Sequence, residues 1–456
     1  MTKGKKKQKW IQVREDMPPI NRNAGGIDVG ATEMWVSVPP DRDAEPVQQY
    51  GAFTRDLYAM VDWLKRCGIE TVAMESTGVY WIPVFQVLEE RGIDVLLVNA
   101  RYAKNVSGRK TDMLDCQWLR TLHTYGLLAG SFQPSAEIGV LRSYLRQRQM
   151  LIDSAATHIQ HMQKALTQMN LQLAHVLSDV TGTTGMRIIR DILKGERDPK
   201  RLAGLRDVRT KSDEETIAKA LEGNYRPEHV FALKQAVELF DVYQQKISDC
   251  DQQIAGYLRT LESKINIQAQ PLKPAREKKK KRRNAPGFDC RHEAYRISGV
   301  DLTQIDSISE SAALTILSEI GADMSPWKTE KHFASWLTVC PNNKITGGKI
   351  FQRQTRKSAN RVRELLCICA QSLINSKSAL GAFCRRMCSR LGPQKGIVAT
   401  AHKLALLIYR LLKFGKDYVD IGEEAYERQY KERVVKNLAR KAKQFGFQLV
   451  LSPATP

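Results

Sequence analysis

Hydrophobic and polar positions follow different patterns in the three parts of this chain, and the first part has the pattern of an α/β domain. Two apolar stretches on either side of a Gly-Ala-Thr turn lie between Gly25 and Val38, which indicates two antiparallel strands. A third strand follows, and then helices alternate with buried strands, expected over Val47–Phe53, Arg55–Cys67, Thr71–Ser76, Pro83–Arg91, Asp94–Asn99 and from Thr111 onward. Three strands, helix, strand, helix, strand and helix is the order typical of a ribonuclease-H-like α/β fold, whose first three strands form a meander.

Apolar residues recur every three or four positions in the middle of the chain. One run covers residues 145–176 and is interrupted by Arg148, and a second covers residues 233–261 and is interrupted by Gln244 and Asp251. This spacing is typical of coiled-coil seams, and two seams in series predict an antiparallel hairpin or an assembly surface. Ordinary helices packed on a globular core would give a similar pattern, so both interpretations stay open.

The last part of the chain, from about Ser298, is again mainly helical. Residues 296–321 resemble a helix-hairpin-helix element, whose Gly-containing turn lets backbone N–H groups approach a phosphate, and helices are also expected over Ala370–Leu391 and Val398–Leu412. The patterns together predict a basic flexible arm (1–20), an α/β domain (21–135), a helical coiled-coil region (136–270), a basic linker (271–290), a mainly α C-terminal domain (291–420) and a basic tail (421–456).

Composition adds a strong positive charge. The 456 residues include 71 Lys and Arg against 49 Asp and Glu, a formal net charge of +22, which favours a polyanionic partner such as nucleic acid. A hydrophobic fraction of 42% excludes wholesale disorder. No secretory signal and no apolar run of about 18 residues is present, so we expect a cytoplasmic, nucleoid-associated protein without membrane contact.

Nine cysteines are scattered over the chain, and their odd number indicates reduced thiols rather than a disulfide framework. Cys384 and Cys388 lie four residues apart with Cys367 and Cys369 upstream, which is only a weak zinc signal because a Cys-x-Cys pair on a helix diverges.

Carboxylates interrupt the α/β domain at four positions. Asp28 lies within the apolar first strand and Glu75 closes the strand expected beside it, and burial of an unpaired carboxylate is costly unless it binds a cation. Asp112 and Asp115 share a face at the start of a helix, although helix starts also favour acids through the helix dipole. Four oxygen ligands suit Mg²⁺ or Mn²⁺, and two such ions about 3.5–4 Å apart can promote attack on a phosphodiester. These four acids are therefore the predicted catalytic metal site.

Basic residues close to these acids, and in the linker, are candidates for phosphate contact. Arg109 and Lys110 precede the acidic pair and could hold the scissile phosphate, or they could simply be solvated. The linker carries an unbroken basic run for which contact with nucleic acid and plain solvation are both open: Lys278, Lys279, Lys280, Lys281, Arg282 and Arg283.

Three segments make the sequence resemble a known family: GIDVGATEMWVSV, the stretch from Ala73 to Pro134 with its MESTG and TDxxD motifs, and LTVCPNNKITGGK. They are similar to the DEDD transposases of the IS110 class of bacterial insertion sequences, the bridge-RNA-guided recombinases, and the similarity extends from about Gly25 to Leu412. The resemblance implies a RuvC-like N-terminal domain, a coiled-coil insertion and a C-terminal transposase domain. It also implies a structured guide RNA whose loops pair with target and donor DNA. A homo-oligomer, dimer or tetramer, would combine the acids of one protomer with a serine nucleophile of another.

The position that matches this serine is Thr346. A threonine hydroxyl can attack phosphorus, although its β-methyl group adds bulk and restricts χ1. We expect Thr346 to form the covalent link to DNA, and the alternatives are a nearby hydroxyl, Thr355 or Ser358, or an impaired copy. The residues that follow would either approach a phosphate or form a plain turn and add positive charge: Gly347, Gly348, Lys349, Arg353, Arg356 and Lys357.

Two other functions use the same sequence features. A RuvC-like junction resolvase or nuclease would use the four acids with water as the nucleophile and form no covalent intermediate. A catalytically inactive relative would retain the fold and bind nucleic acid.

Overall fold

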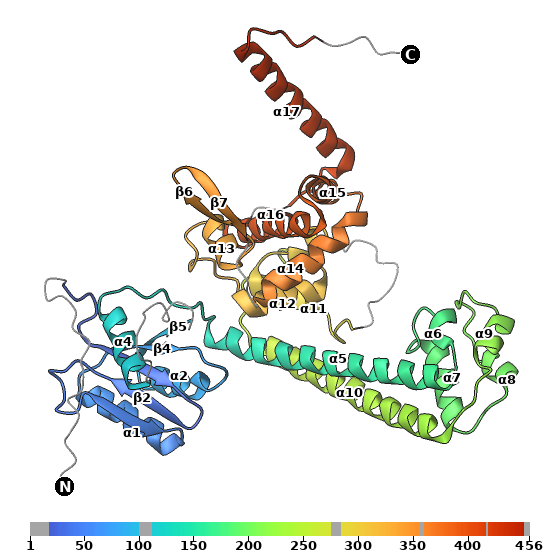
Figure 1. Ribbon diagram of the computed structural model, residues 1–456, viewed down its shortest axis with the longest axis horizontal. Coiled ribbons are helices and arrows are strands. Elements are labelled where there is room, and N and C mark those ends of the chain that lie inside the picture. The colour runs from blue at the N-terminus through green and yellow to red at the C-terminus, as the bar shows by residue number, and fades with distance from the viewer. Residues whose placement is uncertain (1–17, 100–111, 275–283, 355–359, 416–417, 451–456) are drawn as a thin grey trace. The chain divides into compact units, whose positions relative to one another are not determined.

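The computed structural model describes residues 18–99, 112–274, 284–354, 360–415 and 418–450 (Figure 1). The chain folds into two compact units, Met1–Gln133 and Pro134–Pro456. All nine cysteines are free, as the sequence predicts. Within the described ranges, none of the helices combines the length and the hydropathy that crossing a membrane requires.

The first unit is built on a mixed five-stranded sheet with the strand order β3-β2-β1-β4-β5. β1 pairs antiparallel with β2, and β2 pairs antiparallel with β3. β1 also pairs parallel with β4, and β4 pairs parallel with β5. The expected meander followed by parallel strands is therefore confirmed. Sheet and helices fit a ribonuclease-H-like domain. Its elements are β1 (Ala24–Val29), β2 (Glu33–Ser37), β3 (Val47–Gly51), α1 (Thr54–Arg66), β4 (Thr71–Glu75), α2 (Trp81–Glu90), β5 (Asp94–Val98) and α4 (Asp112–Thr124).

Alternation along β1 assigns its residues to two faces of the sheet. Ile27 and Val29 enter an apolar core that α1 and α2 complete with buried residues such as Leu64 and Leu88. Gly26 lies against α4, which covers the opposite face. Asp28 follows Gly26 by two residues and therefore shares the face that α4 covers.

The second unit begins with two long helices, α5 (Ala136–Gln168) and α10 (Pro227–Thr260), which pack side by side (Figure 1). Tyr144 contacts Tyr257, Arg148 pairs with Asp251 and His158 stacks on Tyr243, so residue numbers rise along one helix as they fall along the other. The two helices are therefore antiparallel.

Four short helices connect α5 to α10 and complete a globular core: α6 (Leu173–Val176), α7 (Thr183–Leu193), α8 (Pro199–Ala203) and α9 (Glu214–Ala220). Residues from all of them pack with Met162 of α5 and Leu233 of α10. The prediction that one helical seam extends to residue 176 is wrong at its C-terminal end. The helix α5 ends at Gln168, because Asn170 adopts a left-handed conformation (φ 56°) that a helix cannot continue through.

The C-terminal part is mostly helical, as expected, with one β-ribbon. Its elements are α11 (Cys290–Ser298), the 3₁₀ helix η1 (Leu302–Gln304), α12 (Glu310–Ile320), α13 (Glu330–Trp336), β6 (Asn342–Thr346), β7 (Lys349–Gln354), α14 (Arg361–Ser372), η2 (Leu373–Asn375), α15 (Ala379–Leu391), α16 (Pro393–Phe414) and α17 (Gly422–Gln444).

Two helix predictions for this part need correction. The helix expected over Ala370–Leu391 is interrupted, because Ser378 caps the start of α15 by accepting a hydrogen bond from the Gly381 N–H. The helix expected from Val398 already begins at Pro393, where a proline is tolerated in the first turn.

Candidate metal centre and nucleophile

Close contact between β1 and α4 sets the geometry of the candidate metal site. A Cβ atom on Gly26 would lie 2.2 Å from the carbonyl oxygen of Cys116 and 2.5 Å from the backbone nitrogen of Arg120, so the helix backbone lies directly on the strand. Only glycine permits this approach. As a result, the first turn of α4 begins beside the residues that follow Gly26 in β1.

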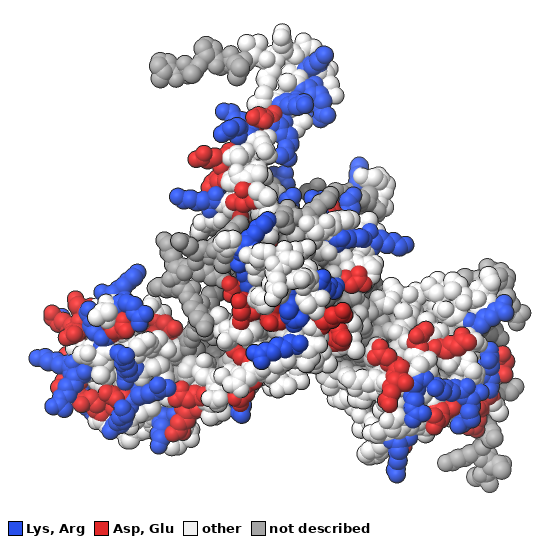
Figure 2. All heavy atoms as spheres, turned by 180° about the vertical axis from the view of Figure 1, so that it is seen from behind, with Lys and Arg blue, Asp and Glu red and all other residues white. Residues whose placement is uncertain are grey.

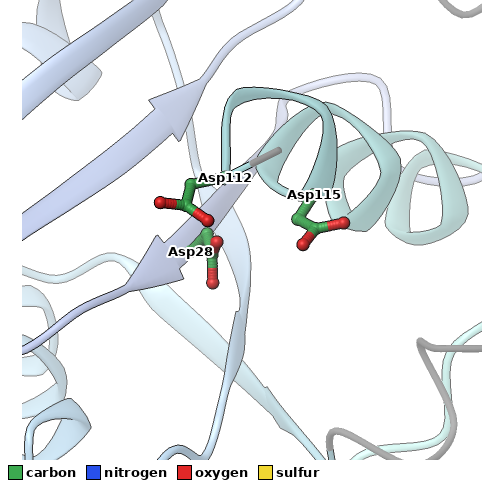
Figure 3. A group of neighbouring side chains, drawn as sticks. All are labelled: Asp28, Asp112 and Asp115. Atoms are coloured by element: carbon green, nitrogen blue, oxygen red, sulfur yellow. The ribbon is translucent and has the colours of Figure 1, made fainter. Parts of the chain in front are cut away.

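Three of the four predicted acids come together at this contact (Figure 3). Asp28 extends from β1, and Asp112 and Asp115 extend from the first turn of α4. One carboxylate oxygen from each residue lies within 4.8 Å of those of the others. Asp28 and Asp115 are half-buried and Asp112 is exposed, so the group lies at the surface, where a hydrated cation can reach it, and not inside the core.

Glu75 lies close in the fold but outside this group of three. It is the last residue of β4, directly after Met74, which pairs with Ile27 in the parallel ladder. Asp28 and Glu75 therefore follow the same cross-strand pair on neighbouring strands, as the strand order predicts. Thr77 donates a hydrogen bond of 3.4 Å to the Glu75 Oε1 atom, which lies at the strand end.

Thr346 lies in the second unit, at the end of β6. Gly347 and Gly348 have φ values of 54° and 74° and form the two-residue turn to β7, in which Lys349 pairs with Thr346. Positive φ at both central positions is the conformation of a type I′ hairpin turn, which explains the Gly-Gly pair without a ligand. The Thr346 and Lys349 side chains are exposed.

Models of known protein families match both the segment with the acids and the segment with Thr346. Residues 25–171 match a DEDD transposase model of the IS110 type, and residues 301–385 match the transposase family IS116/IS110/IS902. The chain belongs to the IS110-class transposases. No curated protein matches it.

An IS110-class transposase is an enzyme that transfers DNA strands, and its DEDD family implies a divalent metal. The first match includes all four predicted acids, and the second includes Thr346 and the turn after it. The group of Asp28, Asp112 and Asp115 fits a divalent cation because carboxylate oxygens are the ligands that Mg²⁺ and Mn²⁺ prefer. A cation there would stabilise negative charge on a phosphodiester under attack.

Residues of α4 behind the acids make hydrogen bonds within the helix and to residues of the sheet region of the transposase. The Cys116 thiol donates to the Met113 carbonyl oxygen at 3.2 Å, and burial, with a further contribution from the Asp28 charge, raises the pKa of Cys116 to about 12. The thiol therefore stays protonated at neutral pH. Further along α4, Arg120 donates to the Val38 carbonyl oxygen at 3.0 Å and His123 Nε2 lies 2.9 Å from Thr71 Oγ1.

Several predicted contact residues lie outside the described part of the chain. They are Arg109, Lys110, Lys278, Lys279, Lys280, Lys281, Arg282, Arg283, Arg356 and Lys357, together with the alternative nucleophiles Thr355 and Ser358. Arg353 is placed only by its backbone, within β7.

The role of Gly26 and the β6–β7 ribbon are two features of the site that the sequence predictions do not include. The ribbon had a signal, because two glycines between Ile-Thr and Lys-Ile are typical of a tight hairpin. Gly26 had none, since a glycine in a strand does not show which helix will approach it.

Proposed function

We propose that the transposase binds one or two divalent cations, Mg²⁺ or Mn²⁺, through Asp28, Asp112 and Asp115, with Glu75 as a fourth ligand. The grouping of three carboxylates from two elements supports this most strongly. Three negative charges so close together repel one another unless a cation or a proton offsets them.

Metal binding can be measured with the full chain by titration with Mn²⁺ and detection of free Mn²⁺ by electron paramagnetic resonance. Asp28→Asn and Asp115→Asn should each weaken binding at least tenfold. Asp62→Asn is the matched control, because Asp62 is an exposed acid of α1 in the same unit, and its only ion pair among the described residues is a long one of 3.8 Å to Arg91. Equal affinity of all four proteins would show that the acids do not bind the metal.

Thr346 is the proposed nucleophile. Its hydroxyl oxygen would bond to phosphorus as the bond from phosphorus to one deoxyribose oxygen breaks, and the proton of the hydroxyl would pass to solvent or to that leaving oxygen. A hydroxyl of the second strand would then attack the phosphothreonine and release Thr346, so the number of phosphodiester bonds is conserved. The exposure of Thr346 at the end of a ribbon supports this role.

The partners proposed are a guide RNA and the donor and target DNA. A net charge of +22 supports them, and so does α17, on which Lys and Arg side chains are prominent (Figure 2). All acids of α17 lie in its first half, and two of them form ion pairs with α15, Glu423 with Arg385 and Glu427 with Arg386. The second half carries only basic charges: Arg433, Lys436, Arg440, Lys441 and Lys443. Guide RNA should therefore bind with strong salt dependence.

A dimer or tetramer is part of the same proposal. Acids and nucleophile belong to different units of the chain, which is compatible with a site composed from two protomers. We further propose that α5 and α10 form a coiled coil that contributes to assembly, within the domain boundaries expected from the sequence. Sedimentation with RNA and DNA present should give at least a dimer, and a monomer under these conditions would exclude a composite site.

A further inference from the structure

The second strand of the β6–β7 ribbon contains one residue more than the first. Lys344 pairs with Gln352 and Ile345 pairs with Ile350, so Phe351 has no residue opposite it. This arrangement is a β-bulge, which bends a strand, re-aims a side chain, and is frequent next to active sites.

The Phe351 ring is exposed to solvent. Its relative accessibility is 84%, one of the highest values among the large hydrophobic residues that the structure describes. Aromatic residues stabilise hairpins mainly by packing on a cross-strand neighbour, and the bulge removes that neighbour. The exposed ring therefore adds little to the stability of the ribbon, and its surface is available to a ligand.

The surroundings of Phe351 indicate what this ligand is. Among the ribbon side chains that the structure describes, the exposed ones other than Phe351 are polar or cationic: Asn342, Asn343, Thr346 and Lys349. A protein or lipid partner would require a wider apolar surface. A nucleic acid strand requires this combination, because its backbone is anionic and each base has a flat π-face.

The shape of the ribbon leads to the same class of ligand. It is a two-stranded sheet that extends from the helical part of the second unit, and a two-stranded ribbon fits into a nucleic acid groove (Figure 1). Thr346 lies at one end of β6 and Phe351 two residues into β7, on either side of the same two-residue turn. The two residues are therefore five positions apart on one hairpin, and a nucleic acid strand bound along the ribbon would pass both of them.

We propose that Phe351 stacks on an unpaired DNA base next to the strand-transfer position and holds that nucleotide for the reaction. This inference rests on the proposed function, because strand exchange is what makes an unpaired base available. Phe351 is a positioning residue and does not take part in the bond changes.

Binding of the full-length protein to three labelled probes tests the inference: a single-stranded DNA, the same strand in a duplex, and an RNA of the same sequence. Loss of one stacked base weakens binding about 5- to 150-fold, so Phe351→Ala should weaken single-stranded DNA binding within this range and duplex binding less than about twofold. Phe351→Trp should bind as the wild type does, and Phe351→Leu should resemble the alanine variant. Phe53→Ala is the control, since Phe53 is also an exposed phenylalanine, with 73% accessibility, but lies in the other unit.

Salt dependence separates stacking from charge. Phe351→Ala should leave the slope of log K against log salt unchanged, because no phosphate contact is lost. Lys349→Ala should reduce the slope by about one, because one contact is lost. With 5-iododeoxyuridine in the DNA, irradiation should link the strand to the tryptic peptide Ile350–Arg353 in the wild type and not in Phe351→Leu.

Unchanged affinity of Phe351→Ala for single-stranded DNA, or the lack of a cross-link to Ile350–Arg353, would overturn the inference. Weakening of the RNA complex alone would overturn the assignment to DNA. The proposed function fails differently: if no Thr346 variant changes covalent adduct formation but Phe351→Ala weakens DNA binding, the stacking role stands and the nucleophile is wrong.

Discussion

Arg148 of α5 and Asp251 of α10 form an ion pair with two hydrogen bonds, of 2.5 Å and 3.3 Å, and their side chains are only 8% and 12% exposed. Both residues interrupt the apolar pattern of their helices, and the charge of each one neutralises the buried charge of the other. Arg148 also donates to the Asn284 carbonyl oxygen at 3.1 Å, and Asp251 accepts from the Gly287 N–H at 3.0 Å. The pair therefore fixes the antiparallel register of the two helices and connects them to the chain that leads into α11.

Removal of one partner should destabilise this hairpin strongly. Arg148→Ala leaves the Asp251 charge without its buried partner, so the free energy of opening should fall by about 3–5 kcal/mol, measured by hydrogen exchange of the α5 and α10 amides. The matched control is Arg190→Ala, because the Arg190–Asp241 pair is half-exposed and should contribute less than about 1 kcal/mol. Similar losses in both variants would mean that burial of the pair has no effect.

Gly26→Ala should displace α4 and disrupt the metal site. The added methyl group would lie 2.2 Å from the backbone of α4, which cannot yield without moving Asp112 and Asp115. We expect at least a tenfold loss of Mn²⁺ affinity together with a lower melting temperature. Gly139→Ala serves as the control, since no atom lies within 4 Å of the added carbon in α5 and helix propensity predicts a gain of roughly 0.5–1 kcal/mol. Unchanged Mn²⁺ binding in Gly26→Ala would contradict the role of this contact.

The stability of the first unit should depend on the ionisation of His123, its only histidine. Burial lowers the pKa of His123 below its usual 6.5, so the folded state favours the neutral ring. The unfolded chain then binds the proton more tightly, and the stabilisation is complete above pH 6.5 and declines as the pH falls from 6.5 towards the lowered folded pKa. Hydrogen exchange of the sheet amides should show this decline in the wild type and not in His123→Gln.

Thr338 carries backbone strain that glycine should relieve. This β-branched residue follows the C-cap of α13 with φ 57°, a conformation that costs an L-residue roughly 1–2 kcal/mol. Thr338→Gly should therefore stabilise the protein by up to about 1 kcal/mol, because glycine loses more entropy on folding and offsets part of the gain. Thr338→Ala keeps the Cβ atom and should give a much smaller effect in thermal unfolding, and a larger gain from alanine would argue against strain.

Much of the first unit could be predicted because its signals are local. Alternation of apolar residues gives the strands, and their order gives the neighbourhood of β1 and β4, which brings Asp28 and Glu75 to adjacent strand ends. The spacing of Asp112 and Asp115 gives a shared helix face. The contact at Gly26 that joins this face to Asp28 is between distant residues, and no local pattern encodes it.

The second unit shows the limits of periodicity. The apolar spacing continues past Gln168, but Asn170, in the left-handed conformation, ends the helix. The same spacing also occurs both where α5 packs on α10 alone, near Arg148, and where α5 contributes to a globular core, near Met162. Turn chemistry could have predicted the ribbon from Gly347 and Gly348, whereas the bulge at Phe351 depends on pairing between strands.

Capture of a covalent protein–DNA adduct tests the central claim most directly. Full-length wild type with Mg²⁺, guide RNA and DNA that carries the ends of the element should give an adduct that resists denaturation and maps to Thr346 by mass spectrometry. Thr346→Ser should retain it, whereas Thr346→Ala and Asp115→Ala should lose it. An adduct that persists in Thr346→Ala would show that another hydroxyl is the nucleophile, and cleavage without an adduct in the wild type would indicate a resolvase that uses water.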